Sequence, residues 1–457
     1  MPSPAAALAY ARDHEQAALD DLKALLRIPS ISTLSERKDD MLRAAHWVAD
    51  RLRTLGFEQV QVMPTARHPV VAGEWMQAGP GAPTLLVYGH YDVQPTDPLD
   101  LWTSDPFEPT LRGDDLFARG ASDMKGQLVV HLRAIEALLR TGGLPVNMRF
   151  LIEGEEEIGS PSLEAFLRQH AGRFACDLCL NADSGILAPD TPALTYALRG
   201  LSYFELRVRG PASDLHSGSF GGAVENPAFA LCRAIAGMRD AQNRVTLPGF
   251  YDAVRPLSDE ERRDLAQLPT DDRWWLEQTG APALAGEEGY TATERATARP
   301  TLEVNGLLSG FTGEGSKTVL PARAMGKISM RLVPDQTTAA VRASLEAYLR
   351  LAMPPGVTWE IEELASGRPA MVERDSRAVQ AASRAMQAVW GRRPLLTRSG
   401  GSVPVVGLIQ EILGADSLML GFGLPDDNLH APNEKQHLPN IYRGIETSIR
   451  FLCEFAG

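Results

Sequence analysis

The spacing of apolar residues in the first part of the chain predicts helices followed by strands. Leucines over residues 19–26 recur at helical spacing, and a second helix is expected over about 41–55, with Gly56 as its stop signal. Short apolar runs follow, and each leads directly into polar residues. These strand-like runs cover residues 84–88, 116–118, 148–152 and 178–180.

An amphipathic helix is predicted between the second and third strand-like runs. Its buried stripe is marked by Leu128, Leu132, Ile135 and Leu139. Strands that alternate with helices favour an α/β domain with a mainly parallel sheet flanked by helices. In open sheets of this kind, ligands bind beyond the carboxyl ends of the strands. The polar residues that follow the runs are therefore the first candidates for a functional site.

The middle of the chain has a different pattern. Residues 203–209 and 327–333 alternate between apolar and polar, as antiparallel strands with one wet face do. Residues 245–300 are rich in charge, Pro and Trp and show no clear period, whereas 417–420 is strand-like again. We therefore expect a smaller α+β domain inserted into the α/β domain. The expected bounds are 1–199 and 371–457 for the α/β domain and 200–370 for the insertion.

The amino-acid composition limits which binding partners are expected. The 457 residues include 45 Lys or Arg and 58 Asp or Glu, which gives a formal charge of −13. A net negative chain without a basic run repels phosphate backbones, so nucleic acid is excluded as the expected partner. No apolar stretch reaches the ~20 residues of a membrane helix. Residues 1–4 lack the basic start of a signal peptide, so the expected location is the cytoplasm.

The four cysteines are too few for a disulfide framework, which fits a reducing compartment. Cys176 and Cys179 form a C-x-x-C pair, but no further soft ligands lie nearby to complete a zinc site. The pair falls in an apolar, strand-like run, whereas redox pairs sit at helix N-termini. We expect both to be plain core residues.

Acidic residues and histidines gather where the predicted strands end. The set consists of His90, Asp92, Asp123, Glu156, Glu157, Asp183 and His430. Imidazole nitrogen and carboxylate oxygen are the ligands that zinc and similar ions accept. Each residue alone is more often a turn or capping residue, but carboxylates that converge on one sheet edge repel one another without cations between them. Together they favour a metal site.

Two short motifs in this set add weight. In the H-x-D pair, Asp92 can orient the imidazole of His90 and raise its basicity. Glu156 and Glu157 are neighbours at the end of a strand, so their side chains diverge. One can bind metal while the other acts as a general base toward water. Taken alone, this acidic dipeptide would be read as a solvated turn.

Six segments carry motifs in a fixed order, namely 89–95, 119–126, 153–160, 181–183, 214–218 and 428–430. In their order and spacing they resemble the co-catalytic dinuclear zinc peptidase and deacylase family. That family includes carnosinases, cytosolic non-specific dipeptidase, acetylornithine deacetylase, succinyl-diaminopimelate desuccinylase and aminoacylase. The resemblance runs from about residue 10 to the C-terminus.

The resemblance implies two divalent metal ions per subunit, with zinc expected and manganese or cobalt as alternatives. Asp123 is then the ligand that bridges the two ions. His90 and Asp183 complete the shell of one ion, and Glu157 and His430 that of the other.

The resemblance also implies the catalytic residues. Glu156 is expected to deprotonate a water that bridges the metal ions and to pass a proton to the leaving amine. Asp92 is expected to hold His90 in its ligand tautomer. The implied reaction is hydrolysis of the peptide bond of a dipeptide or similar small peptide.

Residues of the inserted domain match the family as well. His216 matches a His that reaches across a homodimer to stabilise the oxyanion, which makes the insertion a lid and dimerisation domain. Arg331 matches an Arg that grips a substrate carboxylate. Gly401 and Ser402 lie in a loop that resembles one cradling the same carboxylate. Without the resemblance, these would be a turn His, an exposed strand Arg and a Gly turn.

Residues 314–321 and the long insertion favour the carnosinase and non-specific dipeptidase branch. The alternative is a deacylase or amidase of N-acyl amino acids, of the acetylornithine or succinyl-diaminopimelate type. A relative that binds without catalysis is opposed by the complete ligand set and by Glu156. A nucleophilic hydrolase is disfavoured because the G-x-S-x-G motif is missing, and no His-Glu-x-x-His helix occurs either.

Overall fold

The computed structural model describes residues 4–401 and 403–457, which divide into two compact units. The first unit contains the chain up to residue 196, residues 371–397 and residues 404–457. The second contains residues 197–370 and the short segment around Gly400. None of the helices in these described ranges combines the length and apolarity needed to cross a membrane.

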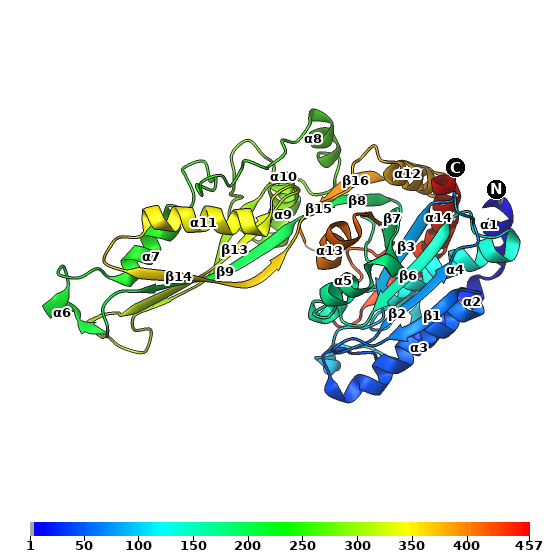
Figure 1. Ribbon diagram of the computed structural model, residues 1–457, viewed down its shortest axis with the longest axis horizontal. Coiled ribbons are helices and arrows are strands. Elements are labelled where there is room, and N and C mark those ends of the chain that lie inside the picture. The colour runs from blue at the N-terminus through cyan, green and yellow to red at the C-terminus, as the bar shows by residue number, and fades with distance from the viewer. Residues whose placement is uncertain (1–3, 402) are drawn as a thin grey trace. The chain divides into compact units, whose positions relative to one another are not determined.

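A six-stranded mixed sheet forms the centre of the first unit, in the order β1-β2-β6-β3-β7-β17 (Figure 1). Strands β6, β3, β7 and β17 are parallel, whereas β2 runs antiparallel to β6 and β1 antiparallel to β2. The strands are β1 Glu58–Met63, β2 Val70–Trp75, β3 Thr84–His90, β6 Asn147–Glu153, β7 Leu178–Asn181 and β17 Asp416–Met419. The expected fold class, α/β with a mainly parallel sheet, is confirmed.

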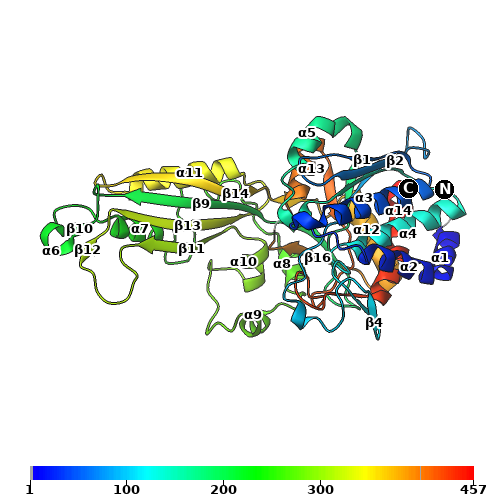
Figure 2. The ribbon, with the colours of Figure 1, turned by 90° about the horizontal axis from the view of Figure 1, so that it is seen from below.

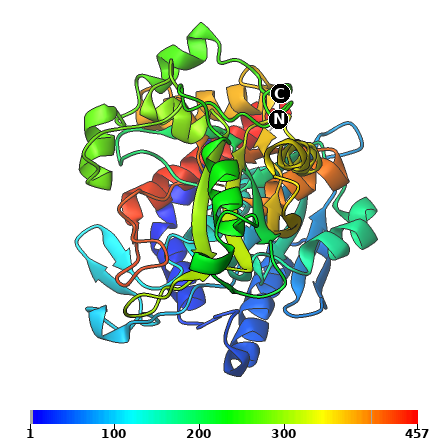
Figure 3. The same cartoon turned by 90° about the vertical axis from the view of Figure 1, so that its left-hand side faces the viewer.

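Helices cover both faces of this sheet, which explains why its parallel strands are almost wholly apolar. The helices are α1 Pro4–Asp13, α2 Glu15–Leu26, α3 Lys38–Thr54, α4 Lys125–Thr141, α5 Leu163–Phe174, α12 Arg377–Trp390, α13 Pro404–Leu413 and α14 Leu438–Ala456. Helices α4, α12 and α14 pack together on one side, and α5 and α13 pack together on the other (Figure 2). The first and last helices, α1 and α14, are also in contact, so the two chain ends are neighbours (Figure 3).

One expected strand does not join the central sheet. Residues 115–117 form β5 (Asp115–Phe117), which pairs with β4 (Thr110–Arg112) and β18 (Lys435–His437) in a small antiparallel sheet. A two-residue turn joins β4 to β5, and Gly113 adopts φ 62° there, a conformation that favours a tight hairpin. The expectation that Asp123 follows a strand of the main sheet is therefore wrong. It lies in the loop between this hairpin and α4.

The second unit is built on a four-stranded antiparallel sheet in the order β11-β13-β9-β14. The strands are β9 Gly200–Arg209, β11 Thr301–Ser309, β13 Arg323–Leu332 and β14 Thr358–Gly367. Residues along β9 and β13 alternate between buried and half-buried, as the sequence pattern predicted. The buried face, with Phe204 and Ile328 at its centre, packs against α7 (Pro227–Ala236) and α11 (Thr338–Ala352).

Shorter elements complete the list of helices and strands. Residues 245–300, which showed no period, contain α8 Asp259–Leu265, α9 Asp272–Thr279 and α10 Ala292–Thr297. A two-stranded ribbon is formed by β10 Leu215–His216 and β12 Val319–Leu320, and α6 Ser217–Phe220 follows β10. Three strands form a further sheet, in the order β15-β8-β16. They are β8 Ala193–Leu198, β15 Ala370–Met371 and β16 Leu395–Ser399.

Candidate metal centre

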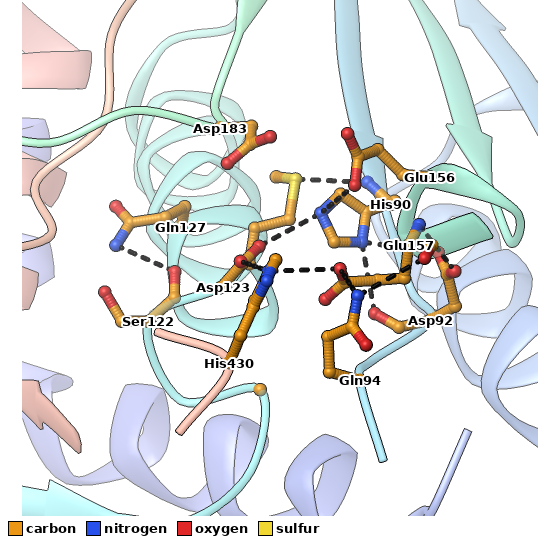
Figure 4. A network of polar contacts seen from close by, with 12 residues as sticks. His90, Asp92, Gln94, Ser122, Asp123, Gln127, Glu156, Glu157, Asp183 and His430 are labelled. Atoms are coloured by element: carbon orange, nitrogen blue, oxygen red, sulfur yellow. Dashed lines mark hydrogen bonds and ion pairs between the residues drawn. The ribbon is translucent and has the colours of Figure 1, made fainter. Parts of the chain in front are cut away.

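The first unit brings together the seven side chains expected to form the site (Figure 4). Because β6, β3 and β7 are neighbours in the sheet, the residues that follow them meet at one edge. His90 ends β3 and Asp92 follows it, Glu156 and Glu157 begin a short 3-10 turn after β6, Asp183 follows β7, Asp123 precedes α4, and His430 lies between β17 and β18.

Asp123 lies at the centre of this cluster. Its Oδ1 is 3.2 Å from His90 Nε2, and its Oδ2 is 2.9 Å from His430 Nε2. His430 Nε2 is also 3.1 Å from Glu157 Oε2, and that oxygen accepts a hydrogen bond of 2.8 Å from Gln94. A carboxylate that faces a histidine on each side has the arrangement of a bridging ligand.

The donor atoms form two overlapping groups in which every atom lies within 4.8 Å of the others. One group contains His90, Asp123 and Glu157, and the other contains His90, Glu156 and Asp183. Imidazole and carboxylate donors in such groups are the shell that zinc, manganese or cobalt accepts. The cluster has enough donors for more than one ion.

The orientation of His90 also fits a metal ligand. His90 and Asp92 are both fully buried. His90 Nδ1 lies 3.1 Å from the carbonyl oxygen of Asp92 and 3.3 Å from its Oδ1, so the ring proton belongs on Nδ1. The lone pair of Nε2 then faces Asp123, and Nε2 has no partner with hydrogen-bond geometry in the described structure. A buried imidazole nitrogen without a hydrogen bond is suited to bind a metal ion.

The charges of the cluster are unbalanced. Burial raises the pKa of Glu156 to about 8 against the pull of His90, and the neighbouring carboxylates Asp183 and Glu157 add to the rise. Burial, followed by the charge of Asp123, raises the pKa of Asp183 to about 7. Hydrogen bonds to Asp123 and Glu157 raise the pKa of His430 to about 10. A divalent cation at this place would offset the repulsion between the crowded carboxylates. It would also take the place of the proton on the histidine.

The end of β6 and the acidic turn after it contain two further carboxylates that lie outside the predicted set of site residues. Glu155 accepts hydrogen bonds from the Thr65 hydroxyl at 2.7 Å and from the backbone N–H groups of His68 and Ser162 at 2.9 and 3.1 Å. Glu153 is buried and accepts hydrogen bonds from the Tyr88 and Ser160 hydroxyls. These two acids fix the turn, whereas Glu156 and Glu157 face the cluster. Most of the partners lie far away in the sequence, so no local pattern reveals them.

Of the residues expected to bind substrate, His216 and Arg331 lie in the second unit. His216 is exposed in β10, and its Nδ1 accepts a hydrogen bond of 3.0 Å from the N–H of Gly218. Arg331 is half-buried in β13, near Arg199. Burial, together with the charge of Arg331, lowers the pKa of Arg199 to about 10. Two guanidinium groups therefore share one region of this unit.

The loop after β16 also belongs to the second unit. Arg199 donates a hydrogen bond of 3.1 Å to the carbonyl oxygen of Gly400, and the N–H of Gly401 donates one of 3.1 Å to the Ser399 hydroxyl. Ser402, expected in the same loop, lies outside the described residues. The loop is thus held by the same arginine that neighbours Arg331.

A sheet edge with metal donors on three neighbouring strands, and with a carboxylate of near-neutral pKa beside them, defines the class of metal-dependent hydrolases. Comparison of the sequence with known protein families supports the same class. The chain belongs to the peptidase family M20/M25/M40, whose model matches residues 86–454. The expected family is thereby confirmed.

Several named proteins are similar to this chain over nearly its whole length. It is 31% identical over 452 residues to the Cys-Gly metallodipeptidase DUG1 of Candida albicans, covering 94% of this chain and 92% of that protein. It is 30% identical over 478 residues to the human Beta-Ala-His dipeptidase, covering 100% and 94%. Among solved structures, the M20 family metallo-carboxypeptidase Sso-CP2 of Sulfolobus solfataricus is 35% identical, with a TM-score of 0.80 over 96% and 99% of the two chains. The expected dipeptidase branch agrees with the first two names.

Proposed function

We propose that this protein is a metal-dependent dipeptidase that hydrolyses the peptide bond of dipeptides and similar small peptides with a free carboxylate. The observation that carries the proposal is the position of Asp123 between His90 and His430, at 3.2 and 2.9 Å, with Glu156 close by. Two relatives that match nearly the whole chain are named as dipeptidases, which supports this substrate class.

The proposed ligand set uses five residues. Asp123 holds both ions, His90 and Asp183 complete the shell of one, and Glu157 and His430 that of the other. When bound, two divalent ions lower the pKa of a water molecule and polarise the scissile carbonyl group. Zinc is the proposed metal, and manganese and cobalt accept the same donors.

Glu156 is the proposed general base. Its carboxylate makes no hydrogen bond in the described structure, and its Oε2 is 3.9 Å from His90 Nε2, so it is free to turn toward a substrate water. A pKa raised to about 8 by burial suits a group that takes a proton and then gives it to the leaving amine. Asp92 keeps the proton of His90 on Nδ1 and also accepts a hydrogen bond of 3.1 Å from the N–H of Glu157.

Arg331 is proposed to bind the substrate carboxylate through its planar guanidinium. Arg199 supports it in two ways, because it adds a second positive charge and holds Gly400 in the neighbouring loop. A requirement for a free carboxylate is common to a dipeptidase and to a carboxypeptidase such as the one named above. The substrate test must therefore separate these two activities.

His216 is proposed to act on the catalytic site of a second copy of the chain. His216 precedes α6 and pairs with Val319, before the start of β13, whereas Arg331 is near the other end of that ten-residue strand. At ~3.3 Å per residue the two side chains are about 30 Å apart. A dipeptide spans only ~7 Å. If both residues serve one substrate, one of them must come from another subunit, so a homodimer is proposed.

Exposed apolar side chains on the second unit support such an assembly. Phe229 on α7 is 68% exposed, and Leu307 and Leu308 on β11 are 55% and 56% exposed. Large apolar side chains that are this exposed are available for contact with a second subunit. The four free cysteines, with Cys179 buried, also fit the reducing environment of the cytoplasm, which is the proposed location.

The dimer is tested by mixing two inactive variants. In a mixture of Glu156→Gln and His216→Asn chains, a mixed dimer has one site with an intact base that receives His216 from the other chain. Turnover should return to roughly a quarter of the wild-type level after exchange of subunits. Mixed dimers that form but remain inactive would show that His216 does not act between subunits.

The substrate class is tested with three forms of one dipeptide, namely free, N-acetylated and C-amidated. The proposal predicts rapid metal-dependent cleavage of the free form and slow cleavage of the amide. Cleavage of the free and acetylated forms at similar rates would favour a carboxypeptidase. A preference for acetyl-ornithine or succinyl-diaminopimelate would favour the deacylase alternative and contradict the proposal.

A further inference from the structure

Glu434 lies fully buried beside the cluster of candidate metal ligands, and both of its carboxylate oxygens accept hydrogen bonds. One oxygen accepts hydrogen bonds of 2.8 Å from the guanidinium of Arg119 and from the backbone N–H of Gly120. The other accepts hydrogen bonds of 3.0 Å from the N–H groups of Ser122 and Asp123. A single side chain thus binds three backbone groups of the loop that carries the central ligand.

The loop around Asp123 needs such an acceptor. It connects the β4–β5 hairpin to α4, which begins only at Lys125, so these three N–H groups have no partner in a strand or helix. Gly120 adopts φ +84°, and a Cβ there would lie 2.6 Å from Val93. Buried backbone N–H groups without acceptors are costly, and a carboxylate is a strong acceptor for several at once. The position of the Asp123 backbone therefore depends on Glu434.

The same contacts fix the segment that carries His430. That segment runs from Asp427 to Glu434 and contains three non-glycine residues with positive φ, including His430 at 60°. At its start, the buried Asp427 accepts a hydrogen bond of 2.7 Å from the Ser122 hydroxyl. At its end, Glu434 binds the backbone of the same loop. Both ends of the His430 segment are therefore attached to residues adjoining Asp123.

We propose that Glu434 is a positioning residue that sets the distance between Asp123 and His430 and thereby the affinity of the metal centre. The two side chains come from segments separated by 307 positions, yet their facing atoms are 2.9 Å apart. Glu434 contacts neither imidazole and acts only through the backbone of the Asp123 loop. The inference rests on the proposed metal-binding function.

The test is Glu434→Gln, which preserves size but turns one acceptor oxygen into a donor that faces N–H groups. Glu136→Gln is the matched control, because Glu136 is a buried carboxylate of α4 whose partners, Arg51 and Arg133, lie outside the cluster. Zn²⁺ affinity is measured by competition with a chromogenic chelator, and the Co²⁺ form is examined by visible absorption. Unfolding of the metal-free proteins is measured in parallel.

Both variants are expected to lose stability, but only Glu434→Gln should bind Zn²⁺ ~10–100-fold more weakly, with an altered Co²⁺ spectrum. Wild-type affinity and spectrum in Glu434→Gln would overturn the proposal and leave a structural role. If that variant does not fold, Glu434→Asp keeps the charge beside Arg119 but cannot reach both sets of donors, and the same result is expected of it. Failure of the wild-type protein to bind two ions would instead contradict the proposed function itself.

Discussion

Replacing Glu156 by Gln should separate catalysis from stability. The side chain makes no hydrogen bond in the described structure and its Oε2 lies 3.9 Å from His90 Nε2, so the amide removes a charge and a proton acceptor without breaking a hydrogen bond. Loss of a general base lowers turnover by roughly 10²–10⁴-fold. The proposed ligands are untouched, so the variant should still bind two metal ions.

Glu156→Gln should lower turnover, but it should raise the stability of the metal-free protein against unfolding. Burial raises the pKa of Glu156 from 4.5 to about 8, so the stability that this group contributes is complete below pH 4.5 and is lost as the pH rises toward 8. Each pKa unit corresponds to ~1.4 kcal/mol, so the loss between pH 4.5 and 7 is at most roughly 3 kcal/mol. Gln does not ionise, and the chelated variant should therefore be more stable than the wild type at pH 7, with the difference vanishing near pH 4.5.

The assay pairs initial rates on a dipeptide with urea unfolding of chelated protein at pH 5 and 7. Glu155→Gln is the neighbouring control. Its carboxylate accepts three hydrogen bonds, so that variant should lose ~1–3 kcal/mol of stability. Turnover of Glu156→Gln within ten-fold of the wild type would refute the base assignment. A loss of stability like that of Glu155→Gln would refute the electrostatic reasoning.

Three further predictions concern other residues. Asp123→Ala should release both metal ions, and elemental analysis that still finds two would contradict the bridging role. Arg331→Ala should lower kcat/KM for free dipeptides by ~10–100-fold but barely affect amidated ones, and equal losses would reject the carboxylate contact. Burial lowers the pKa of His131 to about 4, so its contribution to stability is lost as the pH falls from 6.5 toward 4. In chelated protein, His131→Gln should remove ~2 kcal/mol of the change between pH 7 and 5, and an unchanged pH profile would contradict this.

The candidate metal donors could be located from the sequence because parallel strands bring their carboxyl ends to one edge. His90, Glu156, Glu157 and Asp183 follow strands whose apolar runs are unmistakable, and the structure brings them together. Asp123 was expected there for the wrong structural reason. A three-residue strand with a tight turn before it belongs to a local hairpin, and apolar spacing alone does not distinguish such a hairpin from a strand of the main sheet.

The supports of the site could not be found in this way. Glu434 reaches Asp123 across more than three hundred positions, and Glu155 reaches back to Thr65. Hydrophobic spacing reports which face of an element is buried, but it does not report which distant backbone a buried carboxylate will bind. In the second unit, the pattern of β13 places Arg331 on the half-exposed face. What that guanidinium binds rests on the resemblance alone and stays a prediction.

The dependence of hydrolysis on two metal ions can be tested by metal titration of chelated enzyme, with hydrolysis of a free dipeptide as the readout. We predict no turnover after chelation and recovery that is complete at two equivalents of Zn²⁺, Mn²⁺ or Co²⁺ per chain. The Glu156→Gln protein should bind the same two equivalents without recovering activity. Undiminished dipeptide hydrolysis by fully chelated wild-type enzyme would show that the reaction does not depend on metal, contrary to the proposed mechanism.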